Sequence, residues 1–528
     1  MRQLALAALI PGMVALGCSR AGNDARDWAP AAGQIAYEIE PAVLPLEGER
    51  LSEVEFNTEA YDRIYENPFL LARQNPLSTF SIDVDTASYT NVRRFLNQGD
   101  LPPKDAVRIE ELVNYFTYDY PQPEGESPFS AHVEVAACPW NPNHRLARIG
   151  LKGMEVPEEQ RGPCNLVFLL DVSGSMRDAN KLPLLKSAMK MLVEHLCDRD
   201  RVAIAVYAGA SGLILPSTSC EEKGTILSAL DRLEAGGSTN GGEGIQLAYS
   251  VAEDHFDAQG INRVILCTDG DFNVGMTNQG DLVRMIEQKA SGGVFLTVLG
   301  FGMGNYKDST LEKLADKGNG NYGYIDTLQE ARKVLVEEMG GTLVTIAKDV
   351  KIQVDFNPTR VGAYRLIGYE NRMLRAEDFH DDTKDAGEIG SGHTVTALYE
   401  LIAAGQEGEL PKVDASKYQQ PVASSEAAQT DEIFTLKLRY KQPDSDTSQL
   451  LTFPVLDPGT TLADASGDFH FATAVACFGM VLRESEHRGT STLDLALELA
   501  QAGKGQDPGG YRSEFVQLIG LAKSLSGR

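Results

Sequence analysis

The feature that most constrains the fold is a series of nearly continuous apolar segments in residues 163–342, separated by helical patterns. The strand candidates are almost entirely apolar: Leu166–Leu170, Val202–Tyr207, Val264–Cys267 and Val294–Gly300. Amphipathic helical patterns lie between or after them: Leu184–Leu196, Thr225–Leu233, Ile245–Phe256, Leu282–Lys289 and Thr310–Lys317. Strands that are apolar on both faces and alternate with helices predict a doubly wound α/β domain with a mainly parallel sheet.

Polar oxygen-bearing side chains follow the strands of this predicted sheet. The segment NLVFLLDVSGSM, Asn165–Met176, ends its apolar run in Asp171, Ser173 and Ser175. A glycine-rich loop before a predicted helix carries Thr239, and another apolar strand ends at Asp269. Because ligands of open α/β sheets bind beyond the carboxyl ends of the strands, we expect these five side chains to converge there.

The expected ligand set contains only oxygen atoms, and only Asp171 and Asp269 carry a charge. Hydroxyl and carboxylate oxygens suit a small hard cation, so the pattern predicts a divalent cation site. Mg²⁺ fits best, with Mn²⁺ or Ca²⁺ as alternatives. Few carboxylates leave such an ion electron-poor, which favours an additional carboxylate from a partner protein.

The motif Asp171-Val172-Ser173-Gly174-Ser175, followed by Thr239 and Asp269, resembles the metal-ion-dependent adhesion site (MIDAS) of von Willebrand factor A domains. This resemblance implies a Rossmann-like fold in which Ser173, Ser175 and Thr239 touch the ion directly. It implies that Asp171 and Asp269 act mostly through water. A capped strand-to-helix turn would explain one of these loops but not three.

The amino-terminal residues resemble a bacterial lipoprotein signal peptide. Arg2 precedes an apolar run, Leu4–Leu16, that is too short to span a bilayer and ends at Cys18. We therefore expect a signal peptide over residues 1–18, lipidation of Cys18 and an acidic flexible tether over residues 19–75. The protein would then lie in the bacterial cell envelope, attached to a membrane, with the outer membrane favoured, through its lipid anchor alone.

The segments that flank the central domain predict a second architecture. Residues 76–125 contain helical patterns, and residues 128–160 and 345–456 alternate as β-strands do. We expect both β-rich pieces to form one β-sandwich-like region into which the central domain is inserted. Residues 462–528 return to helical patterns. Together with STFSIDVDTASYTNVRRFL and DDTKDAGEIGSGHTVTALYEL, these regions resemble an uncharacterised bacterial lipoprotein family with a central von Willebrand factor A domain.

Other acidic and glycine-rich segments are weaker candidates for sites. Asp83 and Asp85 lack the hydroxyl spacing of the first motif, and we interpret Asp85 or Thr86 as the cap of a helix that begins near Ala87. The acidic run from Asp378 to Glu388 is typical of a solvated loop, with a weak calcium site that lacks EF-hand spacing as the alternative. The loop Gly300–Ser309 does not have the glycine spacing of a dinucleotide site, so we expect no nucleotide.

The net charge of the chain bears on which kinds of partner it can bind. A net charge of −27 argues against nucleic acid as a partner. We therefore predict a binding module, not an enzyme, that captures an Asp or Glu carboxylate of a partner protein. A metal-dependent hydrolase is a less favoured alternative, with Glu243 or Asp271 as the nearby acid. A structural subunit is the other alternative, in which the apolar face along Phe515, Leu518 and Ile519 would dock a second subunit.

Overall fold

The computed structural model describes residues 61–125, 127–208, 211–237, 241–270, 279–302, 308–384, 386–410 and 425–527. The predicted signal peptide with Cys18, most of the predicted tether and Thr239 lie outside these residues. In the part of the chain that is described, no helix combines the length and the apolarity needed to cross a membrane.

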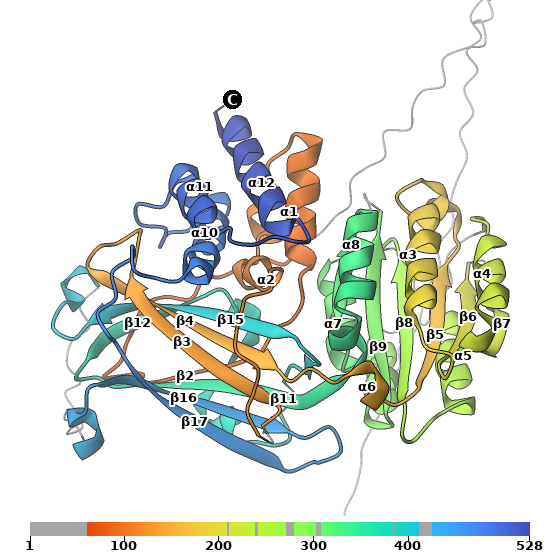
Figure 1. Ribbon diagram of the computed structural model, residues 1–528, viewed down its shortest axis with the longest axis horizontal. Helices are drawn as coiled ribbons and strands as arrows, with labels where there is room; N and C mark the ends of the chain where they lie inside the picture. Colours follow the sequence, from red (N-terminus) through yellow and green to blue (C-terminus); the bar gives the residue numbers. More distant parts are fainter. Residues whose placement is uncertain are drawn as a thin grey trace, which may run out of the picture. The chain divides into compact units, whose positions relative to one another are not determined.

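The central domain is built on a six-stranded sheet with the order β10-β9-β8-β5-β6-β7 (Figure 1). All neighbouring strands are parallel except β7, which runs antiparallel to β6. The strands are β5 (Cys164–Asp171), β6 (Arg201–Tyr207), β7 (Ser211–Ser219), β8 (Ile261–Thr268), β9 (Val294–Phe301) and β10 (Tyr322–Ile325). The predicted doubly wound, mainly parallel sheet is confirmed, although the two edge strands, β7 and β10, were not expected.

Both faces of this sheet are covered, because side chains of successive strand residues point to opposite sides. In β5, Leu166, Phe168 and Leu170 enter one core, while Val167 and Leu169 enter the other. The first core also contains residues of α3 (Leu182–His195), α4 (Lys223–Asp231) and α8 (Leu328–Arg332). The second core contains residues of α5 (Gly241–Asp254), α6 (Gln279–Ser291) and α7 (Asp308–Lys317).

Two further sheets sandwich a separate apolar core. One has the order β1-β12-β15-β4-β3, and the other has the order β13-β2-β11-β16-β17. The strands in these two orders are β1 (Leu70–Leu71), β2 (Leu77–Ser81), β3 (Phe129–Ala137), β4 (His144–Gly153), β11 (Thr345–Phe356), β12 (Val361–Ile367), β13 (Met373–Leu374), β15 (Thr394–Ala403), β16 (Glu432–Lys441) and β17 (Ser448–Leu456). The short strand β14 (Ile389–Gly390) pairs with β11 outside these orders. Strands from before and after the central domain thus share one β-sandwich, as the predicted insertion requires.

The amino-terminal boundary of this sandwich differs from our expectation. β1 lies in the segment predicted as tether, and β2 lies where a helical region was predicted to begin. β1 pairs with β12, and β2 pairs with β11, at least 270 residues later in the chain. Such pairing leaves no local periodicity in a five-residue strand, which is why sequence patterns did not reveal it.

A helical layer combines helices from before and after the central domain. It consists of α1 (Ala87–Gln98), α2 (Ile109–Asn114), α10 (Gly467–Leu482), α11 (Leu493–Ala502) and α12 (Tyr511–Ser526). Phe116, Phe471 and Phe515 meet edge to face in its core, with ring centroids 4.8–5.5 Å apart. The apolar face of α12 that we considered for docking another subunit is therefore buried within the chain itself.

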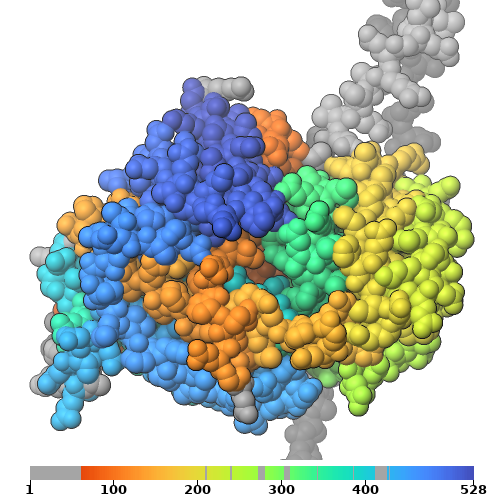
Figure 2. Space-filling view, in the orientation of Figure 1, coloured from red at the N-terminus to blue at the C-terminus, as the bar shows by residue number. Residues whose placement is uncertain are grey.

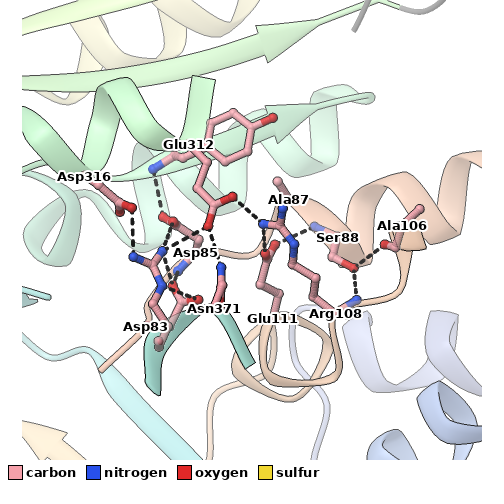
Figure 3. A network of polar contacts seen from close by, with 12 residues as sticks. Asp83, Asp85, Ala87, Ser88, Ala106, Arg108, Glu111, Glu312, Asp316 and Asn371 are labelled. Atoms are coloured by element: carbon pink, nitrogen blue, oxygen red, sulfur yellow. Dashed lines mark hydrogen bonds and ion pairs between the residues drawn. The ribbon is translucent and has the colours of Figure 1, made fainter. Parts of the chain in front are cut away.

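An ionic network fastens the central domain to the flanking regions (Figure 3). Glu312 of α7 accepts from Arg108 at 2.5 Å and from Arg372 at 3.2 Å, so one carboxylate contacts two arginines. Arg372 also pairs with carboxylates from both sides of the junction: Asp83, Asp85 and Asp316. A network of buried, paired polar groups of this kind fixes the position of the central domain relative to the flanking regions.

The helix α1 begins at Ala87 with Thr86 in the N-cap position, as expected, but the cap is not made by a local side chain. The Thr86 side chain makes no capping hydrogen bond to α1. Instead, Glu111 of α2 accepts from the Ser88 backbone N–H at 2.8 Å (Figure 3). Asp85 is used across the junction, where its Oδ1 accepts from the backbone N–H of Tyr322 in β10 at 2.9 Å. A carboxylate from another helix replaces the local cap, which a local motif cannot indicate.

Glu110, beside this network, should make stability depend on pH. Glu110 is 2% exposed, and one of its carboxyl oxygens has no hydrogen-bond partner among the described residues. Burial, aided by the charges of Glu370 and Asp83, raises its pKa to about 7. Because this pKa is raised above the unfolded value, the folded state loses stability as pH rises from about 4.5 through 7.

We expect Glu110→Gln to remove this loss, because glutamine has the shape of the protonated acid. The variant should be more stable than wild type at pH 8 by on the order of 2–3 kcal/mol, and the difference should vanish near pH 5. Thermal unfolding of both proteins between pH 5 and 8 measures this. Glu498→Gln, on an exposed position of α11, is the control. A stability difference that is the same at every pH would refute the prediction.

Candidate metal centre

The first loop of the candidate site begins where β5 ends. Asp171 is completely buried, and its Oδ1 accepts from the Ser173 backbone N–H at 2.8 Å. This turn leads into a short 3-10 helix, Gly174–Arg177, that carries Ser175. The hydroxyl oxygens of Ser173 and Ser175 lie 2.9 Å apart. Two hydroxyls and a carboxylate are thus gathered at the carboxyl end of a central strand.

Backbone hydrogen bonds join this loop to the one that carries Thr239. The N–H of Gly236 donates to the carbonyl of Val172 at 2.8 Å, and the N–H of Gly174 donates to the carbonyl of Gly237 at 3.0 Å. Thr239, two residues after Gly237, lies outside the described residues. The segment that leads to it therefore runs directly alongside the Asp171–Ser175 turn.

The third loop begins after β8, the strand that pairs with β5. The register places Leu170 opposite Cys267, so Asp171 and Asp269 follow neighbouring strand ends. Asp269 is 1% exposed, and its charge contributes to the shifted pKa of Asp171. The structure therefore brings Asp171, Ser173, Ser175 and Asp269 to one end of the sheet.

The residues present fit a divalent cation. The Asp171 carboxyl is completely buried, and it interacts with the Tyr207 hydroxyl as well as with Ser173. The pKa of Asp171 is raised to about 6, mainly by burial and also by the charge of Asp269, against the hydrogen bonds from Ser173 and from the Tyr207 hydroxyl. Keeping this carboxylate ionised at neutral pH costs on the order of 3 kcal/mol, which a nearby cation would offset. The hydroxyl and carboxylate donors match a hard ion such as Mg²⁺.

A softer metal has less support. Across the described ranges, no group of three or more His, Cys, Asp or Glu side chains is arranged to hold a metal ion. The described cysteines are free thiols, and most of them are buried. Burial raises the pKa of Cys267, beside the site, far above its ordinary value, so a thiolate ligand is disfavoured there.

Lys181 is a residue of the site that sequence reasoning missed. It is 7% exposed, and its Nζ donates to Oδ2 of Asp269 at 3.1 Å. The residue is the N-cap of α3, a position where the helix dipole disfavours a positive charge. A lysine before an amphipathic helix ordinarily extends into solvent, so the sequence pattern did not indicate the contact with Asp269. The unfavourable charge at the start of the helix was the only available signal.

The other acidic segments are occupied by protein contacts. Asp378 pairs with Arg375 at 2.9 Å, and Asp382 accepts from Arg439 at 3.1 Å and from Ser448 at 2.6 Å. These bonds lower the pKa of both carboxyls. Asp385 lies outside the described residues. The loop therefore serves to hold neighbouring segments, and the contacts seen do not form a cation cage.

A cavity of about 1000 Å³ lies elsewhere, among the helical layer, β3, β4 and the π-helix Lys333–Glu337. Figure 2 shows the surface hollowed where the blue carboxyl-terminal helices, the orange residues near 120 and the green residues near 335 meet. Arg512 in its wall pairs with Asp468 at 2.7 Å, and Lys333 pairs with Glu338. None of the described site residues lines this cavity, and its charges are largely paired, so we assign it no ligand.

Three family descriptions match successive parts of the chain. "von Willebrand factor type A domain" matches residues 165–337, which include the candidate metal centre. "von Willebrand factor" matches residues 55–148, and "Uncharacterized protein YfbK, C-terminal" matches residues 341–525. Von Willebrand factor A domains are protein-interaction modules that commonly bind a divalent cation through the MIDAS motif.

Several individual proteins are similar to this chain. Uncharacterized protein YfbK of Escherichia coli (strain K12) is 45% identical over 476 residues, which span 89% of this chain and 82% of that protein. Human inter-alpha-trypsin inhibitor heavy chain H4 is 30% identical over 161 residues, 29% of this chain and 17% of that protein. Among solved structures, a von Willebrand factor type A protein from Catenulispora acidiphila is 16% identical, with a TM-score of 0.41 over 76% of this chain and 91% of that one.

Proposed function

Since the chain belongs to the family of Escherichia coli YfbK, proteins with a central von Willebrand factor A domain, we propose that it is an envelope-anchored module that captures a partner protein in a metal-dependent manner. The partner would offer an Asp or Glu carboxylate to a divalent cation, Mg²⁺ in the first place, held by Asp171, Ser173, Ser175, Thr239 and Asp269. Lipidation of Cys18 would anchor the protein, and the outer membrane is the favoured location.

One observation carries this proposal. The buried carboxylate of Asp171 lies in the same turn as the paired hydroxyls of Ser173 and Ser175, and the register of β5 and β8 brings Asp269 to the same end of the sheet. When bound, a divalent cation would supply a Lewis-acidic position for an oxygen of the partner. Ser175 is exposed to solvent, while Asp171 and Ser173 are buried. The ligand set is thus open on the side from which a partner would approach.

A binding role has more support than catalysis. A hydrolase would need a general base within reach of the bound substrate. Glu243 is exposed in the first turn of α5, where its charge favours the helix dipole. Asp271 lies outside the described residues. The apolar face of α12 packs within the chain, so it is not available to dock a second subunit. A purely structural role therefore has less support.

The proposal predicts that partner capture depends on the metal. Crosslinking on intact cells, followed by mass spectrometry, should detect partner peptides with the wild-type protein. These peptides should disappear with Asp171→Ala and with EDTA treatment, and they should persist with Asp178→Ala, an exposed aspartate close to the same turn. Crosslinks that are identical in all four samples would exclude metal-dependent capture.

A further inference from the structure

The Lys181 side chain is held in one place by its surroundings. Besides the 3.1 Å ion pair with Asp269, its stem packs against the backbone of Gly302, at the end of β9. Gly302 has φ +81°, and a Cβ at this position would lie 2.4–2.9 Å from three carbons of the lysine stem. Glycine is therefore required at 302 both for its backbone conformation and for the space that Lys181 occupies.

The ion pair is buried on both sides, since the side chains of Lys181 and Asp269 are 9% and 0% exposed. Burying an ammonium group is costly unless a carboxylate compensates it, and the N-terminus of α3 adds a further penalty. Asp269 thus stabilises Lys181, and Lys181 neutralises Asp269. The described site carries two carboxylates and one ammonium group, so its net charge is −1 and not −2.

We propose that Lys181 is the residue that sets the selectivity of this site for an outside carboxylate. This inference rests on the proposed function and deepens it. Because the Asp269 carboxylate is paired with Lys181, it attracts the cation less strongly. Asp171 and the hydroxyls of Ser173 and Ser175 then provide most of the attraction for the cation. The metal is then bound weakly by the protein alone and retains a strong affinity for a carboxylate oxygen from a partner. Lys181 acts through Asp269 and is a positioning residue.

Lys181→Met in the full chain tests this inference, because methionine keeps an unbranched stem beside Gly302 and removes the charge. Titration with Mn²⁺, followed by electron paramagnetic resonance, should show about 10- to 100-fold tighter metal binding than wild type. Titration of the Mn²⁺-loaded proteins with acetate, as the carboxylate probe, should show weaker acetate binding to the variant. Structural damage would weaken both affinities, whereas loss of the counter-ion changes them in opposite directions.

Two more variants test whether the effect is specific to the position of Lys181. Lys186→Met is the matched control on the same helix, because the Lys186 ammonium donates to the backbone carbonyls of Asp231 and Leu233, and both affinities should stay at wild-type values. Gly302→Ala, purified with Mg²⁺, should displace the lysine stem and change both affinities in the direction of Lys181→Met.

The outcomes separate this inference from the function on which it rests. If wild type binds Mn²⁺ and Lys181→Met binds it with equal or lower affinity, the role of Lys181 is refuted and the metal site stands. If neither protein binds Mn²⁺, the proposed function fails, and the inference fails with it.

Discussion

Replacing Asp171 by alanine is expected to weaken Mg²⁺ binding by about 100-fold, the upper end of what the loss of one supporting carboxylate costs at metal sites. Asp171 is completely buried, and it organises the turn by accepting from the Ser173 backbone N–H. Its loss removes both a negative charge from the site and the acceptor that orients Ser173. Isothermal titration of the full chain with Mg²⁺ measures the effect directly.

Asp171→Asn separates these two contributions. The asparagine carbonyl can still accept from the Ser173 N–H, so the turn should be retained while the charge is lost. We expect binding nearly as weak as in the alanine variant, while the metal-free variant should unfold at a higher temperature than metal-free wild type, because the costly buried charge is gone. Asp178→Ala, close to the same turn but exposed, should bind Mg²⁺ normally. Wild-type affinity in Asp171→Asn would show that this carboxylate does not contribute to a metal site.

Replacing Arg93 by methionine is expected to lower the free energy of unfolding by about 3–5 kcal/mol, the cost of removing one partner from a buried ion pair. Arg93 of α1 is 1% exposed and pairs with Asp326 at 2.5 Å, Glu330 at 2.8 Å and Glu514 at 3.1 Å. Asp326 and Glu330 belong to the central domain, and Glu514 belongs to α12. The variant would leave the buried Glu330 carboxylate without its main counter-ion.

Chemical denaturation at pH 7, followed by tryptophan fluorescence and circular dichroism, measures this loss. Lys104→Met is the matched control, because Lys104 pairs with Glu484 in a bridge whose side chains are 56% and 62% exposed. That change should stay within about 1 kcal/mol of wild type. If Arg93→Met is no less stable than Lys104→Met, the buried network does not hold the helical layer to the central domain.

The central domain could be predicted from the sequence because its strands, helices and site residues each form a pattern within a short stretch of the chain. The strand β5 is apolar at every position from Leu166 to Leu170, which is typical of a strand in a sheet covered on both faces. The loop after it carries Asp171, Ser173 and Ser175, and the sheet topology alone brings Asp269 beside them. Pattern and spacing were therefore sufficient for this part of the site.

The parts that sequence reasoning missed depend on contacts between distant residues. Asp85 or Thr86 was expected to cap α1; Thr86 holds the N-cap position, whereas Asp85 binds the backbone of Tyr322 across the junction. β1 and β2 are too short to show alternation, and they are defined by partners late in the chain. Lys181 was overlooked because nothing local shows that its stem will follow Gly302 into the protein and reach Asp269.

The central claim is that the oxygens around the end of β5 hold one divalent cation, and anomalous diffraction from crystals grown with Mn²⁺ tests it most directly. We predict a single strong anomalous peak at about 2.0–2.3 Å from the hydroxyl oxygens of both Ser173 and Ser175. A structure with these hydroxyls at full occupancy and no anomalous peak beside them, or a peak only at a different location, would contradict the claim.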